Sequence, residues 1–201
     1  MKPMKKRKEN RYMSLLQNEL RKDIPQKEFY TCEDLLSWDE DVRAEIIDGE
    51  LFMMAQPTFR HQGVLMELSR QLANFLDGKP CKVYPAPTGV RLFAEKETLL
   101  EPDIVVICDH SKQDDRIYHG APDMVVEILS PSTARRDRVL KLNLYQQAGV
   151  REYWIVDTEA ECLHVYVLQD EQYQFTQYDD TTAVPVHILP GCEINLNKVF
   201  G

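Results

Sequence analysis

Two continuous hydrophobic runs constrain the fold of this chain more than any other feature. Residues 103–107 read Asp-Ile-Val-Val-Ile and residues 123–129 read Asp-Met-Val-Val-Glu-Ile-Leu, and a Pro-Asp pair leads into each run. An apolar run without alternation is typical of a central strand that is covered on both faces. We therefore expect a sheet with packed layers on both sides, with Asp103 at the head of the first strand and Glu127 inside the second.

The segments before these runs predict a helix, a hairpin and a second, longer helix. A capping box opens a short helix over residues 31–38. Residues 44–54 are expected to form two strands around Asp48-Gly49, a dipeptide typical of tight hairpin turns. A threonine that can act as N-cap precedes apolar residues at helical spacing, which predicts a long helix with one buried face over residues 58–76.

The segments that flank and follow the two runs predict strands and one more helix. Residues 81–93 are extended and interrupted by two prolines, as in an edge or bent strand, and residues 109–120 read as a polar loop. A helix is expected over residues 135–148, with Gly149 as its C-terminal cap.

The C-terminal part predicts antiparallel additions to the sheet. Residues 152–157 read as a buried strand that pairs as a hairpin with residues 162–168. Short strands are expected at 173–178 and 184–189, and residues 194–200 end the chain. The order helix, three strands, helix, strand, with an added N-terminal hairpin and these C-terminal strands, predicts a mixed α/β sheet domain.

Charge separates a basic leader from the rest of the chain. The net charge of −9 argues against a general polyanion-binding surface, because neutralising phosphates needs clustered lysine and arginine. Residues 1–27 are nevertheless rich in basic side chains, and the block at 5–8 could touch nucleic acid. The alternatives are a solvated, disordered tail or an upstream extension with Met13 as the true start. Residues 28–201 are assigned to a single domain.

The cysteines and the hydropathy predict a cytoplasmic protein without a membrane partner. The five cysteines are odd in number and include no Cys-x-x-Cys pair, which favours reduced thiols over a disulfide framework or a structural zinc site. No apolar run approaches the roughly 20 residues that span a bilayer. The basic start also lacks the apolar segment of a signal peptide.

Asp103 and Glu127 are the natural pair of ligands for a hard cation. Neighbouring strands lie about 4.8 Å apart, so carboxylates on two of them can share one ion if the register brings them together. Mg²⁺ (or Mn²⁺) typically takes one or two carboxylates together with waters and substrate oxygens. The backbone carbonyl of Ile128 is placed to add a further ligand.

The helix after the second run supplies the basic candidates. Asp137, Lys141 and Tyr145 recur at every fourth position, so they share one helix face. A lysine beside an attacking water can lower the pKa of that water and stabilise developing negative charge. The alternative is a purely structural role, in which Asp137 and Lys141 are a surface ion pair and the Pro-Asp pairs are strand-entry turns.

Four further residues are candidates for contacts to a metal ion or a substrate phosphate. Arg135, Arg136 and Arg138 lie at the start of the same helix and are candidate nucleic-acid contacts. His61 lies in the first turn of the long helix, as a candidate metal ligand or phosphate contact. A histidine at a helix start is more often a surface or capping residue.

Several motifs together resemble the Uma2 family (DUF820). The resemblance runs from about Tyr30 to the C-terminus. It rests on the stretches Glu101-Pro-Asp103, Pro122-Asp-Met-Val-Val-Glu-Ile-Leu-Ser-Pro-Ser132, Asp137-x-x-x-Lys141 and Gly149-Val-Arg-Glu-Tyr-Trp-Ile-Val-Asp157, and also on Ile47-Asp-Gly-Glu-Leu51, Met53-Met54 and the downstream His61. Uma2 proteins are similar to PD-(D/E)xK nucleases of the restriction-endonuclease-like superfamily. That similarity implies a core of helix 58–76, strands 81–93, 102–108 and 123–129, helix 135–148 and strand 152–157.

The resemblance also implies roles for single residues. Asp103 takes the place of the motif aspartate and Glu127 that of the motif (D/E), whereas the motif lysine is replaced by Leu129. Leucine can neither bind a phosphate nor polarise a water. In this superfamily the next helix sometimes supplies the lysine, and Lys141 is the candidate here.

The resemblance implies a Mg²⁺-dependent endonuclease that hydrolyses phosphodiester bonds in DNA. The first alternative is a catalytically inactive nucleic-acid-binding or interaction module of the same fold, which Leu129 and the acidic net charge favour. A metal-dependent hydrolase with another substrate would share the site, because fold does not fix substrate. The sequence contains no Gly-x-Ser-x-Gly elbow and no Walker-type loop, which argues against a classical nucleophilic enzyme. A two-fold homodimer would suit the cutting of a duplex, although no residue pattern identifies an interface.

Overall fold

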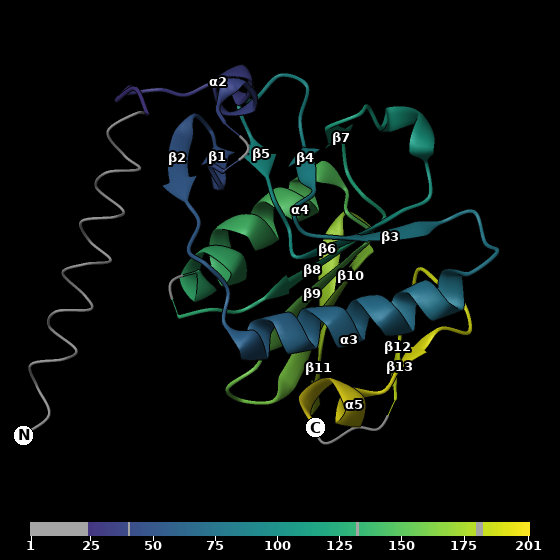
Figure 1. Cartoon of the computed structure of the whole chain (residues 1–201). Coiled ribbons are helices and arrows are strands. Elements are labelled where there is room, and N and C mark those ends of the chain that lie inside the picture. Colours follow the sequence, from purple (N-terminus) through teal and green to yellow (C-terminus); the bar gives the residue numbers. More distant parts are fainter. Residues whose placement is uncertain (1–23, 40, 132, 180–182) are drawn as a thin grey trace, which may run out of the picture.

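Two large sheets carry the fold in the computed structural model, which describes residues 24–39, 41–131, 133–179 and 183–201 (Figure 1). The basic block at 5–8 and Met13 lie outside these residues, so the predictions about them stay untested. The five-stranded sheet has the order β2-β1-β5-β4-β7. Its strands are β1 (Ala44–Ile47), β2 (Glu50–Met53), β4 (Gly89–Arg91), β5 (Leu99–Leu100) and β7 (Ile117–His119).

The six-stranded sheet has the order β11-β10-β9-β8-β6-β3 and holds both hydrophobic runs at its centre. Its strands are β3 (Lys82–Pro85), β6 (Ile104–Ile107), β8 (Met124–Ile128), β9 (Glu152–Asp157), β10 (Cys162–Gln169) and β11 (Gln172–Asp179). The pair β8–β9 is parallel and the other neighbours are antiparallel, so the sheet is mixed. The predicted mixed α/β fold is confirmed.

The parallel pair β8–β9 needs a crossover connection, which a continuous helical segment provides. This segment is a π-helical part, η2 (Arg136–Lys141), followed by the α-helix α4 (Leu142–Ala148). Gly149 ends it in the left-handed conformation, with φ of 86°, as the predicted cap requires. The crossover places the face with Asp137 and Lys141 against the sheet, because both side chains are buried.

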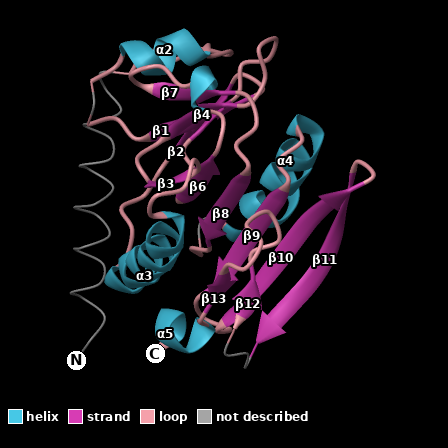
Figure 2. Ribbon diagram, turned by 90° about the vertical axis from the view of Figure 1, so that its right-hand side faces the viewer, coloured by secondary structure: helices cyan, strands magenta, loops and turns pink. Residues whose placement is uncertain are grey.

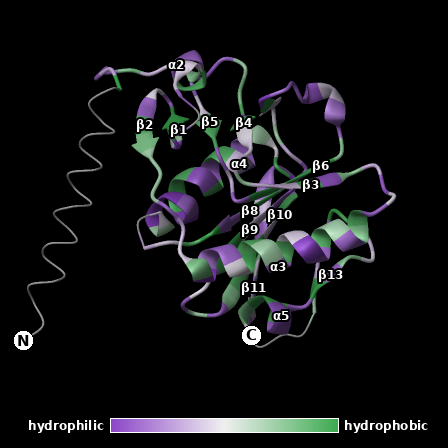
Figure 3. Ribbon diagram, viewed as in Figure 1, coloured by the Kyte–Doolittle hydropathy of each residue, from purple (hydrophilic) through white to green (hydrophobic). Residues whose placement is uncertain are grey.

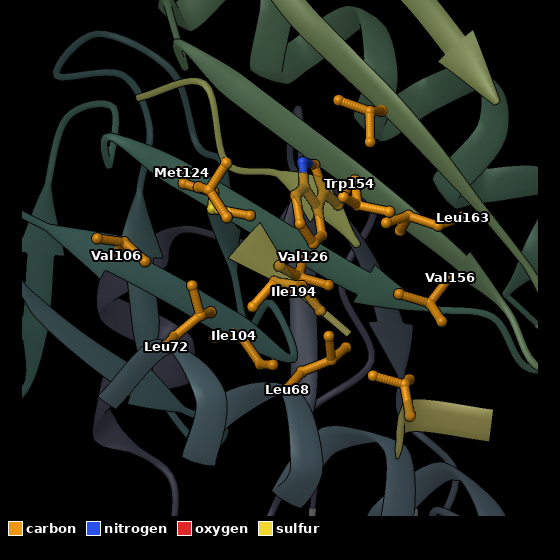
Figure 4. Close-up of a cluster of buried hydrophobic side chains, with 14 of the residues drawn as sticks. Leu68, Leu72, Ile104, Val106, Met124, Val126, Trp154, Val156, Leu163 and Ile194 are labelled. Atoms are coloured by element: carbon orange, nitrogen blue, oxygen red, sulfur yellow. The ribbon is translucent and has the colours of Figure 1, made fainter. Parts of the chain in front are cut away.

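Helices cover both faces of the six-stranded sheet (Figure 2). On one face, α3 (Phe59–Leu76) places Leu68 and Leu72 against Ile104 and Val126 (Figure 4). Residues of α3 alternate between hydrophobic and hydrophilic, as expected for a helix with one buried face (Figure 3). On the other face, buried residues of α4 pack against the alternate residues of the same strands. Coverage of both faces explains why the two runs are apolar throughout.

Smaller elements complete the described chain. The helix α2 (Cys32–Ser37) packs beside the five-stranded sheet, and η1 (His110–Lys112) is a single 3-10 turn. Near the C-terminus, β12 (Val184–Pro185) pairs with β13 (Glu193–Ile194), and α5 (Leu196–Phe200) lies against α3. No helix among the described residues has the length and hydropathy to cross a bilayer.

The local signals in the sequence are confirmed. The predicted capping box is present, since the Thr31 side chain accepts the Asp34 N–H and the Asp34 side chain accepts the Thr31 N–H. Thr58 accepts the backbone N–H of His61 as the N-cap of α3. Asp48 and Gly49 both have positive φ, 48° and 82°, as a tight hairpin turn between β1 and β2 requires.

Three predictions about strands are wrong. The strand expected at residues 184–189 is limited to the two residues of β12, Val184–Pro185. Residues 81–93 are not one strand, because β3 belongs to the six-stranded sheet and β4 to the five-stranded one. Pro85 ends β3 and Pro87 lies in the connection to β4, and neither offers an N–H to a ladder. Residues 109–120 are not only a loop, since β7 pairs in parallel with β4. A three-residue strand is too short to show a periodic pattern in the sequence.

The prediction that all five cysteines are reduced is wrong for one pair. Cys81 and Cys108 form a disulfide, while Cys32, Cys162 and Cys192 are free and buried. Strands β3 and β6 are antiparallel, with Lys82 opposite Ile107, so the next residues outward face each other. A partner across a sheet leaves no local spacing motif, which is why the sequence did not show it.

Candidate active site

A pocket of about 770 Å³ opens where strands of both sheets meet the starts of α3 and η2. Asp103, Glu127 and Ile128 contribute to its lining from the six-stranded sheet. Glu45 contributes from β1, and Lys141 from the end of η2. The sequence predicted four of these five residues as site residues and missed Glu45.

The register between β6 and β8 brings the two predicted carboxylates together. Ile104 lies opposite Val126, so in this antiparallel pair Asp103 lies opposite Glu127. Directly opposite residues point to the same face of the sheet. Asp103 is held by the backbone N–H of Ile128, which donates to its Oδ2 at 2.7 Å.

Lys141 lies beside Glu127, where the sequence motif lacks its lysine. Its Nζ lies 2.8 Å from Oε1 of Glu127, and the hydroxyl of Tyr145 donates to the same oxygen at 2.8 Å. Leu129, two residues beyond Glu127, also lines the pocket but offers no charge. The ammonium beside Glu127 therefore comes from the helical crossover and not from β8.

Two more carboxylates surround the same ammonium. Nζ of Lys141 lies 2.7 Å from Oε1 of Glu45 and 3.6 Å from Oδ1 of Asp137. All these side chains are almost completely buried, with exposed fractions of 1–5%. Three carboxylates thus share one ammonium, and Glu45 also lies 3.4 Å from Arg136.

The electrostatics of this cluster follow from burial and from the three carboxylates around one ammonium. Burial opposes the charged form of Lys141, but the three carboxylates more than offset it and raise the pKa of the amine well above its ordinary value. Burial also raises the pKa of Asp137, although Lys141 acts in the opposite direction. The Oδ1 atom of Asp137 is buried without a hydrogen-bond partner among the described residues.

His61 lies beside Asp103, at the edge of the pocket. Its Nε2 is 3.3 Å from Oδ1 of Asp103, and the side chains are 12% and 14% exposed. The N-cap interaction of Thr58 with the backbone of His61 fixes the turn of α3 that carries the imidazole. Nδ1 of His61 is buried and has no hydrogen-bond partner among the described residues.

The predicted arginines divide into two that line the pocket and one that does not. Arg136 lies 3.4 Å from Glu45, and Arg138 pairs with Asp157 at 2.7 Å and with His164 at 2.9 Å. Arg135 is exposed and is not part of the lining.

The sequence missed two further arginines of the pocket, Arg43 and Arg60. Arg43 pairs with Glu101, and Arg60 pairs with Glu161 at 2.7 Å. Each pocket arginine of the described chain, these two and the two on η2, therefore has a carboxylate partner.

The donor set fits a hard divalent cation. No three histidine, cysteine, aspartate or glutamate side chains of the described chain form a metal cage by themselves. Mg²⁺ does not need such a cage, because it commonly uses one or two carboxylates with waters. Opposed Asp103 and Glu127, together with an oxygen of Asp137 that accepts no hydrogen bond from the described residues, match the needs of such an ion.

The fold matches that of a solved nuclease-type protein. A crystal structure from Anabaena variabilis ATCC 29413, described as "a putative nuclease belonging to DUF820", aligns with a TM-score of 0.71 at 19% identity. The alignment covers 85% of this chain and 97% of that chain. At this identity the likeness shows the fold alone.

The family model of Uma2, described as "Putative restriction endonuclease", matches residues 32–197. The chain belongs to the Uma2 family, as the motifs predicted. A relative in Synechocystis sp. (strain ATCC 27184 / PCC 6803 / Kazusa), "Uncharacterized protein slr1290", is 28% identical over 142 residues. That match covers 69% of this chain and 74% of the relative.

Proposed function

We propose that this protein is a Mg²⁺- or Mn²⁺-dependent endonuclease that hydrolyses phosphodiester bonds in DNA. Membership of a family described as "Putative restriction endonuclease" supports a nuclease role. The observation that carries the proposal is the convergence of Asp103, Glu127 and Lys141 in one pocket, with Lys141 Nζ 2.8 Å from Glu127.

Asp103, Glu127 and the carbonyl of Ile128 would hold the ion, with His61 as a further ligand or phosphate contact. A bound divalent cation supplies charge neutralisation at the phosphate and a more acidic water. The backbone N–H of Ile128 orients Asp103 for this task, since it fixes one of the two carboxylate oxygens. Lys141 supplies a permanent positive charge that stabilises the negative charge of the reacting phosphate.

Arginines of the pocket supply local positive charge in a chain whose net charge is −9. Asp157 and His164 hold the planar guanidinium of Arg138 in place, and a guanidinium is suited to bidentate contacts with phosphate. Arg136 and the exposed Arg135 extend the basic side of the opening. Contacts of these arginines with DNA phosphates release counterions, so affinity is expected to fall as the salt concentration rises.

Cleavage of plasmid DNA with and without a divalent cation tests this function. Asp103→Asn and Glu127→Gln keep the size of each side chain and remove its charge. We expect each to lower the Mg²⁺- or Mn²⁺-dependent rate by at least about 100-fold. Parallel reactions with RNA decide between the two substrate classes.

Asp123→Asn is the matched control for the aspartate variant. Asp123 follows the other Pro-Asp pair, accepts the N–H of Cys108 at 2.6 Å and pairs with Arg151, outside the pocket lining. This variant is expected to cleave like the wild type. Wild-type activity in Asp103→Asn, or no cleavage by the wild type with any divalent cation, contradicts the proposal.

A second candidate function is a DNA-binding module without catalysis. It is favoured by the pairing of Lys141 with buried carboxylates, which is also a purely structural arrangement, and by Leu129 at the motif position. DNA binding that depends on salt, persists in EDTA and is never followed by cleavage would select this candidate.

A cytoplasmic location and a two-fold homodimer are further parts of the proposal. The DNA substrate and the three free cysteines support the location, whereas the Cys81–Cys108 disulfide counts against it. A two-fold dimer would place two equivalent active sites on one duplex, so each site could cut one strand. Sedimentation of the protein alone and with a duplex tests the dimer, and a monomer in both states contradicts it.

A further inference from the structure

Glu45 is a buried acid that comes from a different sheet than the other carboxylates of the pocket. It lies on β1, where all four residues are buried, and its side chain is 1% exposed. Its Oε1 is the nearest carboxylate oxygen to Lys141, at 2.7 Å. The hairpin of the five-stranded sheet thus contributes directly to the site of the six-stranded one.

The position of Glu45 is itself fixed by two neighbours. The backbone N–H of Glu101 donates to Oε1 of Glu45 at 3.1 Å. Arg136 lies 3.4 Å from Oε2, and its guanidinium stacks over the ring of Phe52 on β2. A carboxylate held at both oxygens is a rigid acceptor for a lysine ammonium.

Lys141 is the flexible partner in this contact. A lysine side chain has four rotatable bonds, so its amine needs external contacts to stay in one place. Glu127 and Asp137 are the other contacts, but Glu127 is a proposed ligand whose charge would be shared with a cation. Glu45 is then the nearest carboxylate to the ammonium that is not a proposed metal ligand, and its Oε1 faces Lys141 while its Oε2 faces Arg136.

We propose that Glu45 is a positioning residue for Lys141: it holds the ammonium beside Glu127 and supplies the negative charge that keeps it there when a cation is bound. This inference rests on the proposed nuclease function. It assigns to the N-terminal hairpin a part in the reaction and not only in packing.

The test compares Glu45→Gln with Glu152→Gln. Glu152 is also fully buried, but it accepts from the indole N–H of Trp154 and the backbone N–H of Ile188, outside the pocket lining. Glu45→Gln is expected to lower kcat by about 100-fold, with KM changed by less than about 3-fold. Glu152→Gln is expected to change stability and leave kcat within about 3-fold of the wild type.

A second readout follows the amine directly and needs no activity. In protein with nitrogen-labelled lysine, the buried ammonium of Lys141 should give a proton resonance protected from exchange with water, assigned by its loss in Lys141→Met. Glu45→Gln should remove that protection, and Glu152→Gln should keep it. If wild-type protein cleaves nothing, the proposed function fails while this measurement still decides whether Glu45 holds the amine.

Two results would overturn the inference. One is a kcat in Glu45→Gln within about 3-fold of the wild type. The other is an unchanged, protected Lys141 resonance in that variant. If Glu45→Gln does not fold, Glu45→Asp replaces it, because this variant keeps the charge and withdraws the carboxylate by one bond, about 1.5 Å. The expected result for Glu45→Asp is again a lower kcat at similar KM, and an unchanged kcat contradicts the proposal.

Discussion

Replacement of Lys141 by methionine probes the charge balance of the site. The side chain is 3% exposed and lies within 3.6 Å of three buried carboxylates. Methionine has a similar length and volume, so Lys141→Met removes the ammonium without leaving a large cavity. Glu45, Glu127 and Asp137 then remain buried without their common cation.

Removal of one partner of a buried ion pair costs about 3–5 kcal/mol, because the remaining charge is left uncompensated. For a chain of 201 residues this corresponds to a fall of about 6–20 °C in Tm.

The loss of stability in Lys141→Met depends on pH. A buried carboxylate with a raised folded-state pKa binds its proton more tightly when folded, so stability falls as pH rises through that range. The difference between variant and wild type should therefore shrink on mild acidification.

Urea denaturation of both proteins, at neutral and at mildly acidic pH, measures this prediction. Mg²⁺ or Mn²⁺ is expected to recover part of the loss, because a ligand that binds only the folded state stabilises it by mass action. A Lys141→Met protein within about 1 kcal/mol of the wild type at neutral pH would refute the account of the cluster. A loss that does not change with pH would show that uncompensated carboxylates are not its cause.

Other predictions concern the scaffold that holds the site. Leu72→Ala should cost about 2–5 kcal/mol in urea denaturation, because Leu72 is fully buried between α3 and the sheet. Met66→Ala, on the exposed side of α3, should change stability by less than about 0.5 kcal/mol. Gly149→Ala should cost about 1–2 kcal/mol, since Gly149 has φ of 86°. Gly63→Ala should stabilise by about 0.5–1 kcal/mol, because Gly63 is helical and nothing lies within 4 Å of an added Cβ. Equal effects of Leu72→Ala and Met66→Ala, or of Gly149→Ala and Gly63→Ala, would contradict the local geometry.

The parts of the fold predicted from sequence are those that depend on neighbours in the chain. The turn at Asp48-Gly49 requires two positive φ values, which these residues accept more readily than others. The cap at Thr58 needs only a side-chain oxygen next to a helix start. The two apolar runs required a sheet covered on both faces, and the helices on either side of it supply that cover.

The parts that were missed depend on contacts across the structure. The disulfide between Cys81 and Cys108 and the parallel pairing of β7 with β4 leave no local signal. Glu45 does have a local signal. It is an acid between Ala44 and Ile46, which are both buried, and a buried charge needs a partner of opposite charge. Its partner, Lys141, lies on the crossover far along the chain, so only the structure joins the two.

A crystal structure with Mn²⁺, located by its anomalous scattering, tests the central claim most directly. The account predicts a peak in the pocket, about 2.0–2.2 Å from oxygens of Asp103 and Glu127 and from the carbonyl of Ile128, with Lys141 beside it. Loss of that peak in Asp103→Asn should follow. A fully soaked crystal with no peak at these residues, or a peak only elsewhere on the surface, would contradict the assignment of this pocket as a metal-dependent active site.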